Sequence, residues 1–334
     1  MDYTTFKYIL NLLSPHMATK YTNFVQQPIE PAEKLVITLR YFATGASFRS
    51  MSFAFRVGAS TVSKIVRETA CIMWDVLQPI HMPTPTKETF VQASSEFQEL
   101  WNFPNCIGCI YGKHVRIMCP PHSGTLFFNY KKYYSIVLLA ICDAKYRFLV
   151  IDVGGFGKQS DGATFNSSEF YHLLKSKKIY IPANACLPGT DVNMPFVFLA
   201  DEAFPLSAHV LTPYSSENLN VEKCIFNKRH SRVRKSIECT FGILNSNWRL
   251  LSKCIETSHE TADYLIKAVC ILQNTIIDKE GFERHLTEVE TDQPKNIQVP
   301  RRPRQRGRQS SDALHIRNTF TIYFKENPIH FPNY

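Results

Sequence analysis

The sequence predicts an α/β fold in two parts, an all-helical segment followed by a mixed sheet that is flanked by helices. At 334 residues the chain suits two domains of roughly 150 residues each. Apolar residues recur at helical spacing up to about residue 77 and alternate in short runs beyond residue 100. Beyond that point strands come first and helices follow, with one strand–helix–strand crossover, which is typical of a mixed sheet with helices packed on it.

These patterns divide the chain into four segments. Residues 1–78 are expected to form a helical region, with a helix-turn-helix at about 32–77. Residues 79–100 are expected to be a linker, because residues 78–87 hold three prolines. The sheet domain should span residues 101–285, and residues 286–334 should form a disordered basic tail. That tail suits nuclear import or phosphate contact, with a solvated linker as the alternative, through Arg301, Arg302, Arg304, Arg306 and Arg308.

The helix-turn-helix is predicted from three helical runs and the turn between the last two. One helix ends at Gly45, a second covers residues 47–55, and the third begins near Ser60, which is a good N-cap. Gly58 can supply the positive φ of a tight turn. In DNA-binding proteins of this kind, polar residues at the start of the last helix lie in the major groove. The candidates here are Ser60, Thr61, Ser63, Lys64 and Arg67. A helical hairpin that serves only packing is the alternative.

The sheet domain is predicted from short apolar and alternating runs. Strands are expected at residues 106–110, 114–118, 133–142, 147–153 and 195–200. The third and fourth of these should pair antiparallel through a turn at residues 143–145. Helices are expected at residues 167–175, 227–248 and 259–277.

Composition narrows the class of function. The net charge of +9 favours an anionic partner such as nucleic acid, although a merely basic enzyme would show the same balance. Apolar residues make up 44% of the chain, which is enough for a sizeable core. No run approaches ~18 apolar residues, so no membrane partner is expected, and residues 1–13 lack a secretory apolar run. The ten scattered cysteines should be free thiols, with Cys106 and Cys109 in the core rather than on a metal.

Three acidic residues that end or follow core elements are the candidates for chemistry. Asp201 follows a buried strand, Glu238 lies at the edge of the buried face of a helix, and Asp161 follows a glycine-rich loop. Carboxylates that converge from different elements can hold two Mg²⁺ ions ~3.5–4 Å apart and so cleave a phosphodiester. The plainer alternatives are a turn cap for Asp201 and an ion pair between Glu238 and Arg234. A DNA backbone at this site would pass the basic residues Arg232, Arg234 and Lys235.

Five stretches of the chain resemble the PIF/Harbinger-type transposases and the nucleases derived from them. They are residues 101–115 (WNFPNCIGCIYGKHV), 129–131 (NYK), 160–162 (SDG), 200–206 (ADEAFPL) and 237–249 (IECTFGILNSNWR). The resemblance implies an RNase H-like DDE core, dependence on Mg²⁺ or Mn²⁺, and a DNA substrate. It also implies a nuclear protein, with the cytoplasm as a second location, and a separate Myb/SANT-like partner protein. It leaves open whether the chain forms a homo-oligomer.

The resemblance also assigns roles to single residues. Asp201 matches the second catalytic acid, Glu238 matches the third, and Asp161 matches a further acidic position that would bind metal with them. The first acid should stand where this chain has Tyr111. A phenol with a pKa near ~10 is neutral at pH 7, so it is a poor replacement for a carboxylate that bridges two metals. We therefore expect cleavage to be badly impaired.

Tyr111 leaves two functions open. One is a DDE-type nuclease, a hydrolase or strand-transfer enzyme acting on DNA phosphodiester bonds, with weakened activity. The other is a domesticated, catalytically inactive DNA-binding or chromatin-associated protein. A natural loss, a decayed transposon copy and an introduced change would each place a tyrosine here, and rescue by Asp143 is disfavoured because that residue lies in a hairpin turn. A Cys- or His-based enzyme finds little support, because no acidic or thiol partner stands at motif spacing from His114, His230 or His259.

Overall fold

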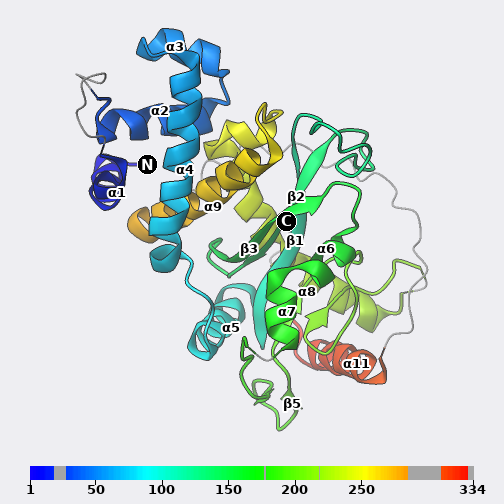
Figure 1. Cartoon of the computed structure of the whole chain (residues 1–334). Coiled ribbons are helices and arrows are strands. Elements are labelled where there is room, and N and C mark those ends of the chain that lie inside the picture. The colour runs from blue at the N-terminus through cyan, green and yellow to red at the C-terminus, as the bar shows by residue number, and fades with distance from the viewer. Residues whose placement is uncertain (19–27, 177, 218, 285–309, 330–334) are drawn as a thin grey trace.

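The computed structural model describes residues 1–18, 28–176, 178–217, 219–284 and 310–329 (Figure 1). The helical part contains α1 (Tyr3–Met17), α2 (Pro31–Thr44), α3 (Phe48–Phe55), α4 (Ala59–His81) and α5 (Lys87–Trp101). The sheet part contains β1 (Cys106–Arg116), β2 (Ser135–Cys142), β3 (Phe148–Phe156), α6 (Asp161–Ser167), α7 (Glu169–Lys175), β4 (Ala185–Cys186), β5 (Asn193–Met194), β6 (Val197–Leu199) and β7 (Val210–Leu211). It continues with α8 (Val221–Asn247), the 3₁₀ helix η1 (Arg249–Ser252), α9 (His259–Glu280) and α11 (Ser311–Glu326).

The main sheet is mixed, as the sequence predicts. Its five strands lie in the order β3-β2-β1-β6-β7. β1, β2 and β3 pair antiparallel in chain order, whereas β6 runs parallel to β1 and to β7. The parallel pairing of β1 with β6 needs a crossover, and α6 and α7 lie in the connection between β3 and β6. The predicted hairpin of β2 and β3 and the strand before Asp201 are confirmed.

Helices cover both faces of this sheet. Side chains alternate along β1, so that Cys109 belongs to a core shared with α8 and α9, whereas Ile110 belongs to a second core shared with α5, α6 and α7. Figure 1 shows α6 and α7 in front of the sheet and α8 behind it. We call these the α8 face and the α6 face. This alternation determines which side chains of β1 and β6 can contact α8.

The helical part follows the predicted order, but its tight turn is built differently. Arg56, not Gly58, adopts the left-handed conformation after α3, with φ of 54°. Gly58 has φ of −56° and is the N-cap of α4, so the predictions of a positive φ at Gly58 and of an N-cap at Ser60 were wrong. The side chain of Arg56 is exposed, so the left-handed backbone at that residue meets no packing obstacle. The predicted end of the preceding helix at Gly45 is confirmed.

Two further segments differ from the prediction. Most of the expected linker is helical, because α4 continues to His81 and residues 87–101 form α5, whose Thr86 and Thr89 make a capping box. Part of the expected tail is also helical, since α11 packs on α8 and buries Phe320 and Phe324 completely. The arginines between residues 300 and 309 lie outside the described residues.

The helical part and the sheet part share one continuous core, which runs from Ile9 in α1 to Phe324 in α11. A polar network crosses the junction between α4 and α9. His81 Nδ1 lies 2.6 Å from Asp278 Oδ2, and Arg147 Nε lies 2.8 Å from Asp278 Oδ1. The N-terminal helices are therefore packed against the sheet domain and are not a separate unit joined to it by a linker. Within the described ranges no helix is long and apolar enough to cross a membrane.

A pH-dependent stability is expected from the hairpin between β2 and β3. Asp143 is buried there, and its Oδ1 accepts hydrogen bonds from the N–H groups of Lys145 and Arg147. Burial raises the pKa of Asp143 to about 6. Because the pKa is higher in the folded state than in the unfolded state, the charge destabilises the fold increasingly as the pH rises from about 4 to about 6.

Replacing Asp143 by Asn keeps an oxygen acceptor in the turn and removes that charge. We expect Asp143→Asn to stabilise the protein by about 1–3 kcal/mol at pH 7 and to lose most of this gain by pH 4. Urea unfolding of both proteins at the two pH values measures the difference. An equal difference at both pH values would contradict the role of the buried charge.

Candidate functional site

The register of the sheet places Tyr111 beside Asp201. Cys109 of β1 pairs in parallel with Leu199 of β6. Tyr111 follows Cys109 by two residues, and Asp201 follows Leu199 by two residues. Because side chains repeat with a period of two, both point to the same face as Cys109 and Leu199, which is the α8 face. The middle of β1 and the residue just beyond β6 therefore present a phenol and a carboxylate side by side. This is the predicted place of the first two acids.

The long helix α8 brings Glu238 to the same place. Its buried stripe includes Val233, Ile237 and Phe241, which pack against the sheet, so Glu238 lies at the edge of that stripe as predicted. The side chain of Glu238 is half exposed, whereas that of Asp201 is largely buried. Asp201 also caps its own turn, because its Oδ1 accepts a hydrogen bond of 2.8 Å from the N–H of Ala203.

Arg234 lies between the two carboxylates. Its Nη2 atom is 4.0 Å from Asp201 Oδ2 and 4.0 Å from Glu238 Oε1. Only 13% of the Arg234 side chain is exposed, so its pair with the largely buried Asp201 is shielded from water, whereas its pair with Glu238 is partly open to solvent. The pair with Glu238 one helical turn away was the plainer alternative for that residue, and it is present. Arg234 was also predicted to contact a DNA backbone, but its guanidinium turns inward to the acids.

Aromatic contacts hold the Tyr111 ring in the same group. The ring centroid lies 5.5 Å from that of Phe241, and the Arg234 guanidinium lies 6.0 Å from the Tyr111 centroid. A guanidinium at this distance from an aromatic face is attracted by the ring quadrupole. Tyr111 thus packs as a neutral half-buried ring and supports the cation that pairs with both acids.

Asp161 lies on the other face of the sheet. It is the first residue of α6, capped by Ser160, and does not lie in a free loop. A Cβ atom at position 112 would lie 2.7 Å from Asp161 Oδ1, so glycine at 112 leaves room for this carboxylate. Gly112 follows Tyr111 in β1 and therefore faces the α6 side. Gly162, the next residue of α6, lies against the turn that follows Asp201, because a Cβ atom there would lie 3.0 Å from the carbonyl oxygen of Ala203.

The side chains present do not fit a two-metal site. A carboxylate cage for Mg²⁺ or Mn²⁺ would need several acidic oxygens facing one another. Here a phenol stands at position 111 where a carboxylate would be needed, and Arg234 already supplies a positive charge between Asp201 and Glu238. Across the described ranges, no three His, Cys, Asp or Glu side chains are placed together to hold a metal ion. The arrangement places one guanidinium where it offsets part of the charge of two carboxylates.

Lys113 is a neighbour of the site that sequence reasoning did not single out. It lies two residues beyond Tyr111 on the same face, with its Nζ 5.4 Å from the Phe241 ring centroid. Burial, assisted by the positive charge of Lys131, lowers the pKa of Lys113 to about 8. Lys113 could have been predicted as a neighbour of the site, because it lies two residues from the expected first acid in the same strand. Asp143, the conceivable rescue residue, stays engaged in its turn.

The predicted DNA-contact residues lie in two places. On α4, Ser60, Thr61, Lys64 and Arg67 are exposed and Ser63 is half-buried, whereas Val62, Ile65 and Val66 point into the core. This confirms which face of α4 is exposed. On α8, Lys235 is exposed and Arg232 is half-buried. Both basic groups thus lie on helix surfaces, one in the N-terminal part and the other beside Glu238.

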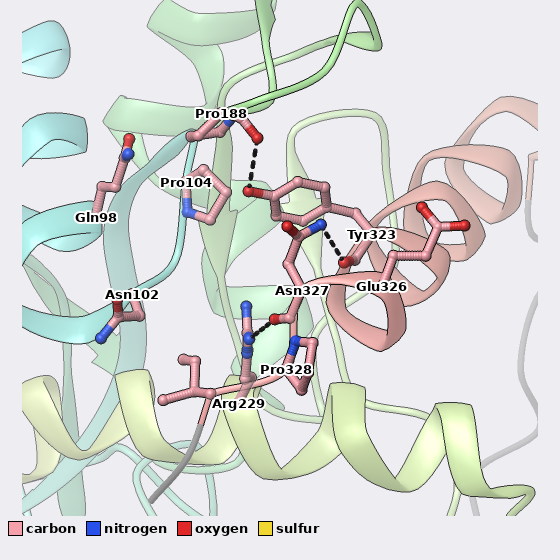
Figure 2. A pocket seen from close by; sticks show the side chains of 10 residues that line it. Gln98, Asn102, Pro104, Pro188, Arg229, Tyr323, Glu326, Asn327 and Pro328 are labelled. Atoms are coloured by element: carbon pink, nitrogen blue, oxygen red, sulfur yellow. Dashed lines mark hydrogen bonds between the residues drawn. The ribbon is translucent and has the colours of Figure 1, made fainter.

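A pocket of about 420 Å³ lies elsewhere, between α5, α8 and α11 (Figure 2). Its wall includes Asn102, Arg229, Tyr323 and Asn327. Polar groups there bond one another: Arg229 donates to the carbonyl of Asn327, and the Tyr323 hydroxyl donates to the carbonyl of Pro188. The pocket includes neither acid of the site, and its hydrogen bonds serve to fasten the end of α11.

The residues of this site lie within a region that matches a known protein family. Residues 110–274, which begin just before Tyr111 and contain all three acids, match the DDE superfamily endonuclease family. Two relatives come from Arabidopsis thaliana: the protein Antagonist of like heterochromatin protein 1, which is 26% identical over 82% of this chain and 70% of its own length, and the protein ALP1-like, which is 27% identical over 83% and 68%. The putative nuclease HARBI1 of Xenopus laevis is 23% identical over 75% of this chain and 69% of its own length. No solved structure matches the chain significantly.

Proposed function

We propose that this chain is a DNA-binding protein built on a DDE endonuclease domain, which holds DNA and does not cleave it. The observation that carries the proposal is the group formed by β1, the end of β6 and α8, where Arg234 lies 4.0 Å from both Asp201 and Glu238 and a phenol stands at the place of the first acid. DDE-type cleavage depends on carboxylates that position metal ions. With one carboxylate replaced by a phenol and a guanidinium paired with the other two, that requirement is not met.

The binding half of the proposal rests on charge. The chain has a net charge of +9, and α4 displays Lys64 and Arg67 on its exposed face. Such groups release counterions from the phosphate backbone when they bind DNA. The resemblance to PIF/Harbinger transposases suits this role, and a relative whose name marks it as an antagonist of a heterochromatin-type protein suits a chromatin function. The second candidate, a nuclease with weakened activity, is favoured by the relative named a putative nuclease.

The nuclear location and the separate Myb/SANT-like partner belong to the same proposal, because both follow from the PIF/Harbinger resemblance. A fluorescent fusion of the full chain is expected in the nucleus, alone or when the partner is co-expressed. Exclusion of the fusion from the nucleus in both conditions would contradict this part.

One experiment separates the two candidates. The full chain is mixed with supercoiled plasmid and Mg²⁺ or Mn²⁺, and binding to a labelled duplex is followed in parallel by fluorescence anisotropy. We expect binding that needs no metal, weakens steeply with salt, and persists in Asp201→Asn, a change that keeps the turn cap and removes the charge. Metal-dependent nicking that disappears in Asp201→Asn would establish the weakened nuclease instead.

The exposed face of α4 gives a further test. Replacing Lys64 and Arg67 together by Ala should weaken duplex binding and reduce the slope of log affinity against log salt by about 2, roughly 1 for each lost phosphate contact. Val62, Ile65 and Val66 keep α4 in place, so folding should be unaffected. A charge-matched control replaces the exposed Lys175 and Lys178. An equal loss in the control would show that only net charge matters.

A further inference from the structure

The connection between β1 and β2 forms a basic surface that has no role in the proposed function. No Asp or Glu occurs between residues 100 and 142. Within this stretch the side chains of Arg116, Lys131 and Lys132 are exposed at the end of the sheet. A surface with this charge favours a polyanion over an acidic or neutral partner.

Exposed aromatic rings are interleaved with these charges. Tyr130 is 60% exposed and Phe128 is 38% exposed. The Lys131 Nζ lies 5.6 Å from the Tyr130 centroid, and the Arg116 guanidinium lies 5.6 Å from the Tyr133 centroid. Rings beside cations are the combination by which proteins bind single strands, because bases stack on the rings and phosphates meet the charges.

The segment that displays Tyr130 is held rigidly. Asn129 is 97% buried, and its Oδ1 accepts hydrogen bonds from the N–H groups of Lys131 at 2.9 Å and Tyr133 at 3.3 Å. Its Nδ2 donates to Ser135 Oγ at 2.9 Å, and that oxygen also lies 2.9 Å from His114 Nδ1. A ring presented by a fixed backbone loses little freedom when a ligand stacks on it.

The same network joins Tyr130 to the strand of the site. The His114 ring packs edge-on to Tyr130, with centroids 5.5 Å apart. His114 lies three residues beyond Tyr111 in β1, which is roughly 10 Å along the strand. Because side chains alternate, His114 faces the α6 side, so DNA held at the site would reach Tyr130 by passing around the end of β1.

We infer that Tyr130 is a stacking platform for an unpaired base of a DNA strand, with Lys131 and Lys132 on the adjoining phosphates. The inference rests on the proposed DNA binding and names the form of DNA that the site prefers, a duplex with a single-stranded end. Stacking on an aromatic ring commonly changes affinity by about fivefold or more per base and is tolerant of sequence. The preference for an overhang should therefore not depend on which bases form it.

The test compares two labelled duplexes, one blunt and one with a short single-stranded overhang, by fluorescence anisotropy with the full chain. We expect the overhang to bind about fivefold or more tighter. Tyr130→Ala should remove this preference and leave blunt binding unchanged, whereas Tyr130→Phe should keep it. Tyr180→Ala is the matched control, because Tyr180 is also 60% exposed and has Lys87 Nζ 5.5 Å from its ring centroid. That control should keep the preference.

The outcomes distinguish this inference from the proposed function. Blunt binding without any preference for the overhang, or a preference that survives Tyr130→Ala, overturns the stacking platform and leaves DNA binding intact. Equal weakening of both duplexes by Tyr130→Ala in a protein with unchanged melting temperature also overturns it. Absence of binding to either duplex contradicts the proposed function itself.

Discussion

Tyr111→Asp is expected to give this protein a nicking activity on supercoiled DNA that the unchanged chain lacks. The new carboxylate would lie beside Asp201 on the α8 face, in the register set by the pairing of Cys109 with Leu199. It would add a negative charge to a group in which one guanidinium now pairs with two acids. Removing one member of a cooperating catalytic set commonly costs roughly 10⁴-fold or more, so the gain should be at least roughly 100-fold over background.

Plasmid nicking in Mn²⁺ and in Mg²⁺ measures this gain. Tyr111→Asn is the matched control, because it has the size of Asp without the charge, and it should stay inactive. Adding Asp201→Asn to Tyr111→Asp should abolish the new activity. If Tyr111→Asp folds, as judged by thermal melting, and still neither binds Mn²⁺ nor nicks DNA, then the tyrosine is not what silences the site.

Asn274→Ala is expected to destabilise the fold by about 3–5 kcal/mol. Asn274 is fully buried in α9, where its Oδ1 accepts the N–H of Phe148 at 2.8 Å. Its Nδ2 donates to the carbonyls of Phe148 at 2.8 Å and His81 at 3.0 Å. Alanine would remove the partner of the N–H and of the carbonyl of Phe148 and leave the His81 carbonyl only Arg147 Nη2 at 3.3 Å, and each buried group left unpaired costs about 1–3 kcal/mol. The loss should be large because the residue ties the end of α4 to β3.

Urea unfolding at pH 7 measures the loss. The control is Asn247→Ala on α8, since Asn247 is half-buried and makes one hydrogen bond of 3.1 Å to Gln273. That change should cost about 1 kcal/mol. Similar losses in the two variants would contradict the junction role of Asn274.

The sheet could be predicted because its central strand is one continuous apolar run with a clear turn after it. Residues 135–142 are continuously buried, as an apolar central strand should be, and the turn at residues 143–145 stops the run. The side-chain period of two then fixes which residues of β1 face α8, so the placement of Tyr111 follows once the pairing with β6 is known. That pairing joins segments about 90 residues apart, and no local pattern specifies its register.

Helices α5 and α11 were not predicted, because neighbouring proline-rich and arginine-rich segments outweighed their helical spacing. The prolines before residue 87 suggested a linker, but Thr86 opens a capping box and Phe90 and Phe97 recur at helical spacing. In α11, Phe320 and Phe324 are spaced for one helical face, but they follow an arginine-rich run that suggested a tail. The inward turn of Arg234 was not predictable either, because the packing of Val233 and Ile237 against the sheet sets the rotation of α8.

In the proposed function, the Arg234 guanidinium occupies the place between Asp201 and Glu238 where a nuclease would bind metal. The most direct measurement is an anomalous difference map at the manganese edge, from crystals of the full chain with duplex DNA grown in Mn²⁺. We expect uncut DNA, the Arg234 guanidinium within ion-pair distance of both acids, and no manganese between them. A manganese peak held by Asp201 and Glu238, with Arg234 displaced, would contradict the claim.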